Sequence, residues 1–540
     1  MIIEKIKVEN YKIFKNKIIE LNESINIFVG ENDSGKSSIL ELISIVTSGK
    51  FGNINFERQL KANLFNFDIR NEFIMQIKKL PEKAILPIIR IEAYCKNEEK
   101  YSDYKGTNNS LGEDCPGISV LVEMDNEYSK EYKNLVEKNE IYDIPIEFYK
   151  VQYRNFKGES VIFRYSPFKI ALIDTTKKDY SNMVNRFVAE NISTYLSEKE
   201  KIDLCVAYRK NKNNFRNNDV VSKLNEEIER NVKLADRSIS IDMMESTTDE
   251  WKNEMSISVD NIPFENIGFG SQNTIKIELA LKNSIDETNL LLVEEPENNL
   301  SYGNMSKLIT KMQENKDKQI FISTHSSFVA NKLGLSNIIL VSNGKINNLS
   351  KLNDDTMNYF KKLPGYDTLR LVLANEVILV EGPADDLIVQ RAYFDKYSRL
   401  PIEDGVDIIV VDSLAFKRYC DIALLINKKI KIVTDNDGNI YENIKIKYKD
   451  YFDKDSIDFF YEKDETLKTL EPSVISVNKK SIDQFKEFKN AISKNESLLN
   501  KNEEEILSFM KENKTEWSMR VFDYVNKIEY PEYIKDAIKK

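Results

Sequence analysis

A glycine-rich loop near the N-terminus limits the folds open to this chain more than any other feature of its sequence. Residues 30–37 read GENDSGKS and match G-x-x-x-x-G-K-[ST] at every fixed position. The loop follows a predicted strand at 26–30 and precedes a predicted apolar-periodic helix that begins KSSILELISIV, which is the context that such a motif requires. A chance glycine-rich turn is the alternative, and this context disfavours it. The sequence therefore predicts an α/β domain with a phosphate site.

The loop predicts a nucleotide with its metal ion. Backbone N–H groups and the dipole of the following helix favour a polyphosphate. We expect Lys36 to reach the β and γ oxygens from a solvated loop, and Ser37 to ligate Mg²⁺. The predicted cofactor is ATP, and the predicted cofactor-binding residues are Gly30, Asn32, Ser34, Gly35, Lys36, Ser37, Ser38 and Glu294.

Two later strands supply the groups that such a nucleotide site needs for hydrolysis. The buried strand predicted at 290–295 (LLLVEE) ends in two acidic residues, of which Glu294 would orient Mg²⁺ and Glu295 would polarise the attacking water. The strand predicted at 319–324 is followed by His325, which suits a sensor of the γ-phosphate. A solvated strand end and a structural histidine are the alternatives, and the phosphate loop favours the functional interpretation.

Composition excludes several classes of protein. The net charge of −10 argues against binding of nucleic acid by the whole surface, so any such site is a local groove. A single histidine excludes chemistry built on several histidines, which leaves carboxylates and lysines as acids, bases and ligands. Four scattered cysteines without a CxxC pair, and no apolar run of roughly 18–20 residues, predict a cytoplasmic protein without a membrane partner.

A second group of carboxylates follows a polar connector at about 349–367. Strands predicted at 376–382 (EVILVEG), 407–412 and 431–437 (KIVTDND) restart a β/α alternation. Acidic side chains at the ends of neighbouring parallel strands repel one another unless cations bind between them, and oxygen-only ligands favour Mg²⁺ or Mn²⁺. We expect metal ligation by Ser37 and Glu294 in the first site, and by Glu381, Asp385, Asp435, Asp437 and Glu471 in the second. An ordinary acidic turn is the alternative for Asp435 and Asp437.

The first part of the chain resembles the ABC-type ATPases of the repair and chromosome-structuring kind. The resemblance rests on the opening IEKIKVENYKIF, the phosphate loop, the long interval before the acidic strand, and the histidine after the next strand. It implies a signature segment that a partner subunit's nucleotide reads, and residues 268–272 (GFGSQ) fill that place. Phe269 stands where a serine is usual, which argues against rapid hydrolysis but not against ATP binding.

The second part resembles the TOPRIM fold, through VILVEGPADDLIV and VTDNDG. A TOPRIM domain directly after an ABC-type ATPase resembles the OLD (overcoming lysogenization defect) nucleases, to which the Gabija anti-phage nuclease belongs. The resemblance implies an α/β fold with an ATPase domain at 1–370, a helical dimerisation insertion at about 175–255, a TOPRIM domain at 371–475 and a helical extension at 476–540.

The same resemblance implies DNA cleavage by two metal ions. Glu381 and Lys514 would act in it, with Glu295 and His325 as the catalytic residues of the ATPase. Lys514 is the first candidate for the basic residue that assists cleavage, and Arg520 is the second. Asp412 is followed by Ser-Leu, which differs from the second Asp motif of topoisomerases, so a metal role is not assigned to it.

We therefore expect an ATP-regulated, Mg²⁺-dependent DNA endonuclease in anti-phage defence. It would form a homodimer or higher homo-oligomer, with a possible second defence-system subunit. An ATP-switched DNA-binding or repair clamp of the RecF/SMC type, without nuclease activity, is the first alternative. A topoisomerase-like enzyme is the second, but the 65 residues after 475 leave little room for a domain that carries its tyrosine.

Overall fold

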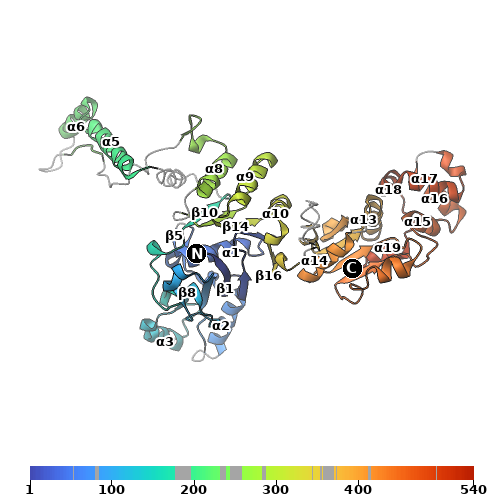
Figure 1. Ribbon diagram of the computed structural model, residues 1–540, viewed down its shortest axis with the longest axis horizontal. Helices are drawn as coiled ribbons and strands as arrows, with labels where there is room; N and C mark the ends of the chain where they lie inside the picture. Colours follow the sequence, from blue (N-terminus) through green and yellow to red (C-terminus); the bar gives the residue numbers. More distant parts are fainter. Residues whose placement is uncertain are drawn as a thin grey trace. The chain divides into compact units, whose positions relative to one another are not determined.

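A computed structural model describes most of the chain in two compact units. It covers residues 1–52, 54–79, 84–176, 196–231, 239–243, 258–282, 288–342, 344–352, 355–356, 370–372, 374–411, 415–493 and 496–540. The first unit is Met1–Phe28 with Gly35–Thr324, and the second is Val29–Ser34 with His325–Lys540. Figure 1 labels the elements of both.

An antiparallel sheet forms one half of the first unit. Its order is β2-β1-β6-β8-β7, and β9 pairs with β8. The strands are β1 (Ile3–Tyr11), β2 (Phe14–Glu20), β6 (Ile89–Cys95), β7 (Lys105–Gly106), β8 (Cys115–Met124) and β9 (Tyr149–Asn155), with helices α2 (Phe67–Lys79) and α3 (Ser129–Glu137) between them. Ile6, Val8 and Ile91 are fully buried in this sheet. The apolar residues of the opening sequence therefore form part of the buried core beneath this sheet.

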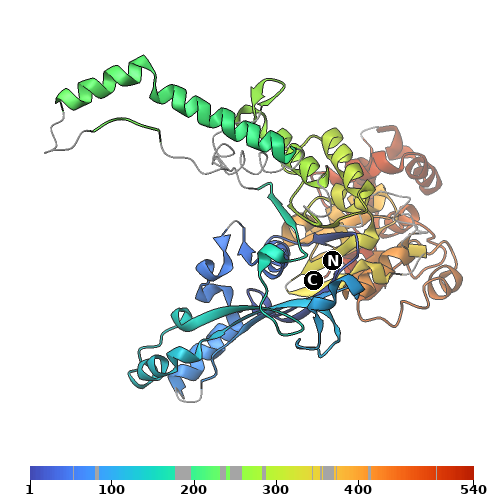
Figure 2. The same ribbon diagram turned by 60° about the vertical axis from the view of Figure 1, so that its left-hand side comes forward.

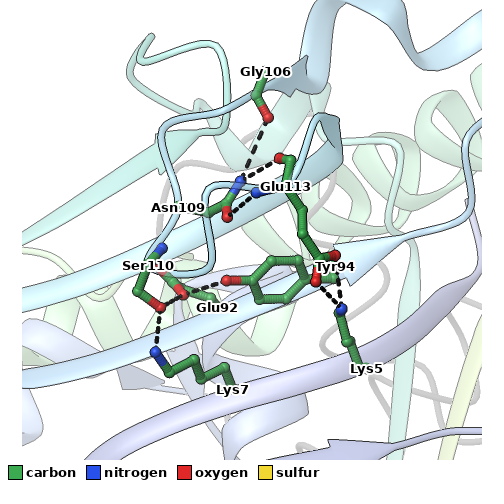
Figure 3. A network of polar contacts seen from close by, with 8 residues as sticks. All are labelled: Lys5, Lys7, Glu92, Tyr94, Gly106, Asn109, Ser110 and Glu113. Atoms are coloured by element: carbon green, nitrogen blue, oxygen red, sulfur yellow. Dashed lines mark hydrogen bonds and ion pairs between the residues drawn. The ribbon is translucent and has the colours of Figure 1, made fainter.

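A polar network fixes the loop between β7 and β8 to this sheet (Figure 3). Glu92 is 2% exposed, and its carboxylate accepts hydrogen bonds from the Tyr94 hydroxyl at 2.7 Å and the Ser110 backbone N–H at 2.9 Å. Lys7 donates to the Ser110 hydroxyl at 2.7 Å. Strands β1 and β6 and the loop thus share one satisfied set of partners, as buried polar groups require.

A parallel sheet forms the other half of the first unit, in the order β10-β13-β14-β3. Its strands are β3 (Ile25–Val29), β10 (Ile170–Asp174), β13 (Leu290–Glu294) and β14 (Gln319–Thr324), with helices α1 (Lys36–Ser48), α8 (Phe269–Lys282) and α9 (Tyr302–Glu314). Every residue of β14 is buried, which explains its unbroken apolar run because both faces of a parallel sheet are covered.

One buried glutamine joins the two sheets of the first unit. The Ile3 backbone N–H donates to the Gln319 side-chain oxygen at 2.9 Å, and the Gln319 amide donates to the carbonyls of Ile3 and Asn22 at 2.7 and 2.8 Å. The first strand of the chain is therefore tied to the start of β14.

Two helices occupy the described part of the predicted insertion. They are α5 (Glu198–Arg216) and α6 (Asp219–Asn231), and they follow one another through a short turn (Figure 2). They lie within the helical insertion expected at about 175–255, of which residues 177–195, 232–238 and 244–257 lie outside the described residues. Before the insertion, Phe163–Tyr165 forms a 3-10 turn.

A four-stranded parallel sheet is the centre of the second unit. The order is β18-β17-β19-β20, and every neighbouring pair is parallel. The elements are β17 (Glu376–Val380), α13 (Pro383–Tyr397), β18 (Val406–Val410), α14 (Phe416–Ile426), β19 (Ile430–Val433) and β20 (Ile457–Phe460), with a π-helical turn at Tyr441–Ile446. A hairpin, β15 (Ile338–Ser342) and β16 (Lys345–Asn348), and helix α10 (Ser327–Leu333) precede them.

The predicted helical C-terminus packs into the same core. Its helices are α15 (Leu470–Asn478), α16 (Ile482–Ile492), α17 (Glu503–Glu512), α18 (Lys514–Phe522) and α19 (Glu532–Ala537). Trp517 and Ile534 are fully buried in one apolar cluster with Ile388 of α13 and Val433 of β19. The last helices are therefore part of the body that holds the second group of carboxylates.

The remaining short strands form two ribbons in the first unit: β4 (Lys50–Phe51) with β5 (Ile54–Asn55), and β11 (Ser258–Val259) with β12 (Ile262–Pro263). Among the described residues, no helix combines the length and apolar character needed to cross a membrane.

Candidate nucleotide and metal sites

The phosphate loop has the local geometry that its sequence predicts. Gly30 directly follows β3, and the Ser34 backbone N–H donates to the Glu31 carbonyl at 3.3 Å to close a turn. Gly35 then precedes α1 with a φ of 107°, a value that side chains with a Cβ rarely adopt. Asn32 is exposed and Ser38 is half-buried. The loop ends directly at the positive end of a helix.

Lys36 differs from its expectation in one respect. It is the first residue of α1 and is only 5% exposed, so the expectation of a solvated loop lysine is wrong. Its ammonium group is already surrounded by the protein, and this removes most of the entropy that a long side chain loses on binding a phosphate.

The predicted magnesium ligands of the first unit lie together. The Ser37 hydroxyl donates a short hydrogen bond to the Glu294 carboxylate, which stands at the last position of β13. A hydroxyl and a carboxylate oxygen at this place are the donors that a nucleotide-bound Mg²⁺ takes from such a loop and an acidic strand. The residues present fit the ion.

Two residues that the sequence did not single out orient the following glutamate. Glu295 has a φ of 47°, and the Asn298 amide donates to its carboxylate at 3.0 Å. The Thr175 hydroxyl donates to the carbonyls of Glu294 and Glu295 at 2.8 and 2.5 Å. The Thr175 contacts depend on the β10–β13 pairing, so the sequence carries no spacing signal for them, whereas Asn298 lies only three residues after Glu295 and its contact is local. His325 directly follows β14 and is half-buried.

The signature segment packs on the loop that follows the acidic strand. A Cβ on Gly270 would lie 2.0 Å from the Asn299 carbonyl oxygen, so only glycine fits there. The Gln272 amide donates to the Ile267 carbonyl at 3.1 Å. Helix α8 begins at Phe269 and therefore includes all of the segment after Gly268.

Glu381 anchors the second group of carboxylates. It follows the last residue of β17, and its carboxylate accepts hydrogen bonds from the Asp435 backbone N–H at 3.1 Å and from the Thr434 hydroxyl. Gly382 and Pro383 then start α13, which places Asp385 in the first helical turn. Carboxylates from the end of β17, the first turn of α13 and the end of β19 therefore lie at one edge of the sheet.

Burial and neighbouring charges act on two carboxylates at this edge. Burial, followed by the charges of Glu381 and Glu471, raises the pKa of Asp385 to about 7. Burial, followed by the charges of Asp385 and Glu381, raises the pKa of Asp435 to about 9. Within the described residues no three acidic, histidine or cysteine side chains converge closely enough to hold one ion. The oxygen donors fit a divalent cation in kind, because a cation relieves the repulsion that raises both pKa values.

Lys514 reaches this cluster and Arg520 does not. The Lys514 ammonium lies 3.4 Å from the Glu471 carboxylate, which is nearly inaccessible and also accepts a hydrogen bond from the Thr469 hydroxyl at 2.6 Å. Arg520 instead pairs with Glu516 at 2.6 Å and donates to the Ser493 hydroxyl. The structure therefore places Lys514, the preferred candidate for the assisting lysine, beside the carboxylate cluster, and it places Arg520 elsewhere.

Asp435 and Asp437 are separated by a buried asparagine that the sequence did not single out. The Asn436 amide donates to the carbonyls of Glu462 and Asp464 at 2.9 and 3.0 Å, and its oxygen accepts from the Gly438 N–H at 2.8 Å. Asp437 is exposed with a φ of 49°. Its charge contributes least among those raising the pKa of Asp435, so it lies at the margin of the cluster. Asp412 lies outside the described residues.

Comparison with curated proteins gives short matches. The DNA replication and repair protein RecF of Clostridium kluyveri is 34% identical over 87 residues, which cover 16% of this chain and 23% of that protein. The DNA double-strand break repair Rad50 ATPase of Methanococcus maripaludis is 33% identical over 76 residues, 14% of this chain and 8% of that protein. The chain spans less than a quarter of the length of these relatives.

Comparison with solved structures finds partial similarity. The SMC head domain from Thermotoga maritima has 15% identity and a TM-score of 0.30, with 64% of this chain and 97% of that chain covered. The recombination mediator protein RecF with ATP has 12% identity and a TM-score of 0.32, with 64% and 98% covered.

Two family profiles match the chain in succession. The AAA ATPase domain matches residues 1–330, more than half of the sequence, and the overcoming lysogenization defect protein-like TOPRIM domain matches residues 372–437. The phosphate loop and acidic strand lie in the first match, and Glu381, Asp385 and Asp435 lie in the second. The chain thus belongs to the AAA ATPase domain family and is an ATPase–TOPRIM fusion of the overcoming lysogenization defect kind.

Proposed function

We propose that this protein is an ATP-binding, Mg²⁺-dependent DNA endonuclease whose TOPRIM domain cleaves and whose ATPase domain regulates cleavage. The carrying observation is the cluster of Glu381, Asp385, Asp435 and Glu471 at the carboxyl edge of a parallel sheet, with Lys514 beside it. A nuclease-type ATPase uses a nucleotide and a divalent metal in general, and the oxygen-only donors favour Mg²⁺ or Mn²⁺.

The residues of the cluster have separable roles in this proposal. Two bound cations would supply Lewis acidity at the scissile phosphate and activate a water molecule. Glu381 is held by two hydrogen bonds from the end of β19 and would orient the cations. The Lys514 side chain is 59% exposed and pairs with Glu471 at 3.4 Å, so it can turn toward the leaving oxygen of a bound strand.

The ATPase site would regulate the nuclease through its occupancy. Ser37 and Glu294 would hold the nucleotide's Mg²⁺, Glu295 would polarise water from the orientation that Asn298 gives it, and His325 would respond to the γ-phosphate. Slow turnover fits Phe269 in the signature segment, because the serine that usually contacts a partner's nucleotide is missing.

A homodimer through the insertion at about 175–255 completes the proposal. On α5, Ile202 and Val206 are 62% and 42% exposed, and on α6, Val220 and Leu224 are 64% and 44% exposed. Each pair has i, i+4 spacing, so each helix presents an apolar stripe to the solvent. Exchange of all four for serine should convert a dimer to a monomer in light scattering after gel filtration; an unchanged mass would place the interface elsewhere.

In this proposal the protein acts in the cytoplasm during anti-phage defence. Its substrate is DNA, and a second subunit of the defence system can act with it. The domain boundaries expected from the sequence, 1–370, 371–475 and 476–540, remain part of the proposal. The packing of Trp517 and Ile534 against α13 supports counting the last segment with the TOPRIM domain.

Plasmid cleavage tests the proposal. We expect the wild type to relax or linearise supercoiled DNA with Mg²⁺ or Mn²⁺, and Glu381→Ala and Asp435→Ala to lose cleavage while ATP binding persists. Asp458→Ala, on the exposed side of β20, is the matched control and should cleave normally. Cleavage by both site variants at every metal concentration would contradict the assignment.

An ATP-switched DNA-binding or repair clamp without nuclease activity is the second candidate. The segment similar to RecF of Clostridium kluyveri favours it. ATP-dependent retention on DNA, without cleavage at any Mg²⁺ or Mn²⁺ concentration, would support the clamp.

A further inference from the structure

The loop between β20 and α15, residues 461–469, is held beside the acidic turn that follows β19. The Asn436 amide of that turn donates to the Asp464 carbonyl at 3.0 Å. Within the loop, the Thr466 N–H and hydroxyl donate to the Asp464 carboxylate at 2.9 and 2.6 Å, and the Leu467 N–H donates to the Asp464 carbonyl at 3.0 Å. These bonds fix the course of the loop just before its last two residues.

Lys468 lies directly on the acidic turn. Its backbone carbonyl accepts a hydrogen bond from the Asp437 N–H at 3.1 Å. A Cβ on Gly438 would lie 2.9 Å from the Lys468 Cε and 3.2 Å from its Cδ, so the aliphatic part of the lysine crosses this glycine. Both the backbone and most of the side chain are therefore held in place, and the ammonium group is one bond beyond the held part.

The same lysine stands in the chain between two of the expected metal ligands. On one side its carbonyl contacts Asp437. On the other side the next residue, Thr469, donates to the Glu471 carboxylate at 2.6 Å. Lys468 therefore lies at the margin of the carboxylate cluster, on the side of Asp437.

The charge of Lys468 differs in its surroundings from that of Lys514. The Lys514 ammonium pairs with Glu471 at 3.4 Å. Lys468 is exposed, and within the part of the chain that the structure describes no ion pair or hydrogen bond engages its ammonium group. A lysine held at a metal site without a carboxylate partner can pair with an anion that arrives there, and a compact ammonium group suits a phosphate.

We propose that Lys468 contacts a backbone phosphate of the bound DNA strand, next to the phosphate at which the cluster cleaves. The neighbouring phosphate fits better than the scissile one because Asp437, and Lys468 beyond it, lie at the margin of the cluster. Such a contact fixes the register of the strand and reads no base sequence. The inference rests on the proposed function and adds a substrate contact to it.

The salt dependence of DNA binding tests the contact. Lys468→Met keeps an aliphatic side chain over Gly438 and removes the charge. Fluorescence anisotropy of the full chain with a short DNA duplex, with Ca²⁺ in place of Mg²⁺ to suppress cleavage, measures the binding constant. We expect the slope of its logarithm against the logarithm of salt concentration to become shallower by about 0.9, the value for one phosphate contact. Lys468→Arg should keep the wild-type slope, because a guanidinium group also pairs with phosphate.

Lys454→Met is the matched control. Lys454 is also exposed, but it precedes β20 and so lies toward the opposite edge of the parallel sheet. Its loss should leave the slope unchanged. Calorimetry of Lys468→Met with Mn²⁺ and without DNA should give wild-type binding, because the Lys468 backbone carbonyl, which holds Asp437, is retained.

Three results would overturn the inference. They are a wild-type slope for Lys468→Met, an equal change of slope in Lys454→Met, and weaker Mn²⁺ binding by Lys468→Met, which would show that the side chain acts on the metal site itself. A wild type that binds DNA but cleaves it with no divalent cation would instead overturn the proposed nuclease function, and the slopes would still decide whether Lys468 contacts DNA.

Discussion

Replacement of Asn436 by aspartate should destabilise the TOPRIM domain out of proportion to the size of the change. The side chain is fully buried, and its amide donates to two carbonyl oxygens, those of Glu462 and Asp464. An ionised aspartate offers no donor and would face both carbonyls with negative charge. A protonated one could satisfy only one of them.

The magnitude follows from these contacts. Loss of two buried hydrogen bonds, with at least one carbonyl left unsatisfied, amounts to about 3 kcal/mol. For a unit of roughly 150–250 residues, 1 kcal/mol shifts the melting temperature by about 2–4 °C, so we expect a decrease of about 6–12 °C.

Asn439→Asp provides the matched control. It makes the same change in charge three positions later, but the Asn439 side chain accepts from the Glu442 N–H at 3.0 Å and is exposed. An aspartate oxygen can replace that acceptor, so the melting temperature should change by less than about 2 °C.

Differential scanning calorimetry of the full chain measures both variants. Hydrogen exchange should locate the effect of Asn436→Asp at residues 434–440 and 462–468. Equal melting temperatures for the two variants would refute the reasoning, because it attributes the difference to the burial of Asn436 and to the two hydrogen bonds that its amide donates.

Three further predictions concern ligands and pH. Lys36→Ala should lose the thermal stabilisation by ATP and keep the fold; an undiminished shift would contradict the phosphate-loop assignment. Glu295→Gln should bind ATP normally and slow single-turnover hydrolysis, and an unchanged rate would remove its proposed role. Because the folded-state pKa values of Asp385 and Asp435 are raised to about 7 and about 9, the folded state binds more protons than the unfolded state above about pH 4, so their contribution to stability falls as pH rises toward 9. A bound divalent cation should reverse this, and its stabilising effect on the melting temperature should be larger at about pH 9 than at about pH 6; equal effects would contradict a metal site at these carboxylates.

The sequence predicts the parallel strands better than their ends. The strand expected at 319–324 is confirmed to the residue, since an all-buried strand has the length of its apolar run. The strand expected at 431–437 spans only Ile430–Val433. Its boundary could not be predicted because the alternation simply stops at Thr434, where the side chain turns to Glu381.

The site residues also fall into two groups, those that the sequence predicts and those that it does not. Those in motifs, such as Ser37 and Glu381, were predicted because a fixed spacing places them on a loop or strand end. Thr175 and Asn436 were missed because their importance depends on which distant carbonyl the fold brings to them. The structure thus adds the partners that orient the motif residues.

The glutamine that joins the two sheets has a consequence for how the protein is made. The Ile3–Gln319 bond spans 316 residues of sequence, which at about 5–20 residues per second takes roughly 15–60 s of synthesis. During that time β14 has not been synthesised, so β3 cannot pair with it and Ile3 of β1 cannot bond to Gln319. Assembly of the ATPase fold therefore cannot be completed before Gln319 has left the ribosome, and truncated chains that end before Gln319 should aggregate rather than form a smaller ATPase. Late closure of so long a loop also predicts slow folding and a period of dependence on chaperones.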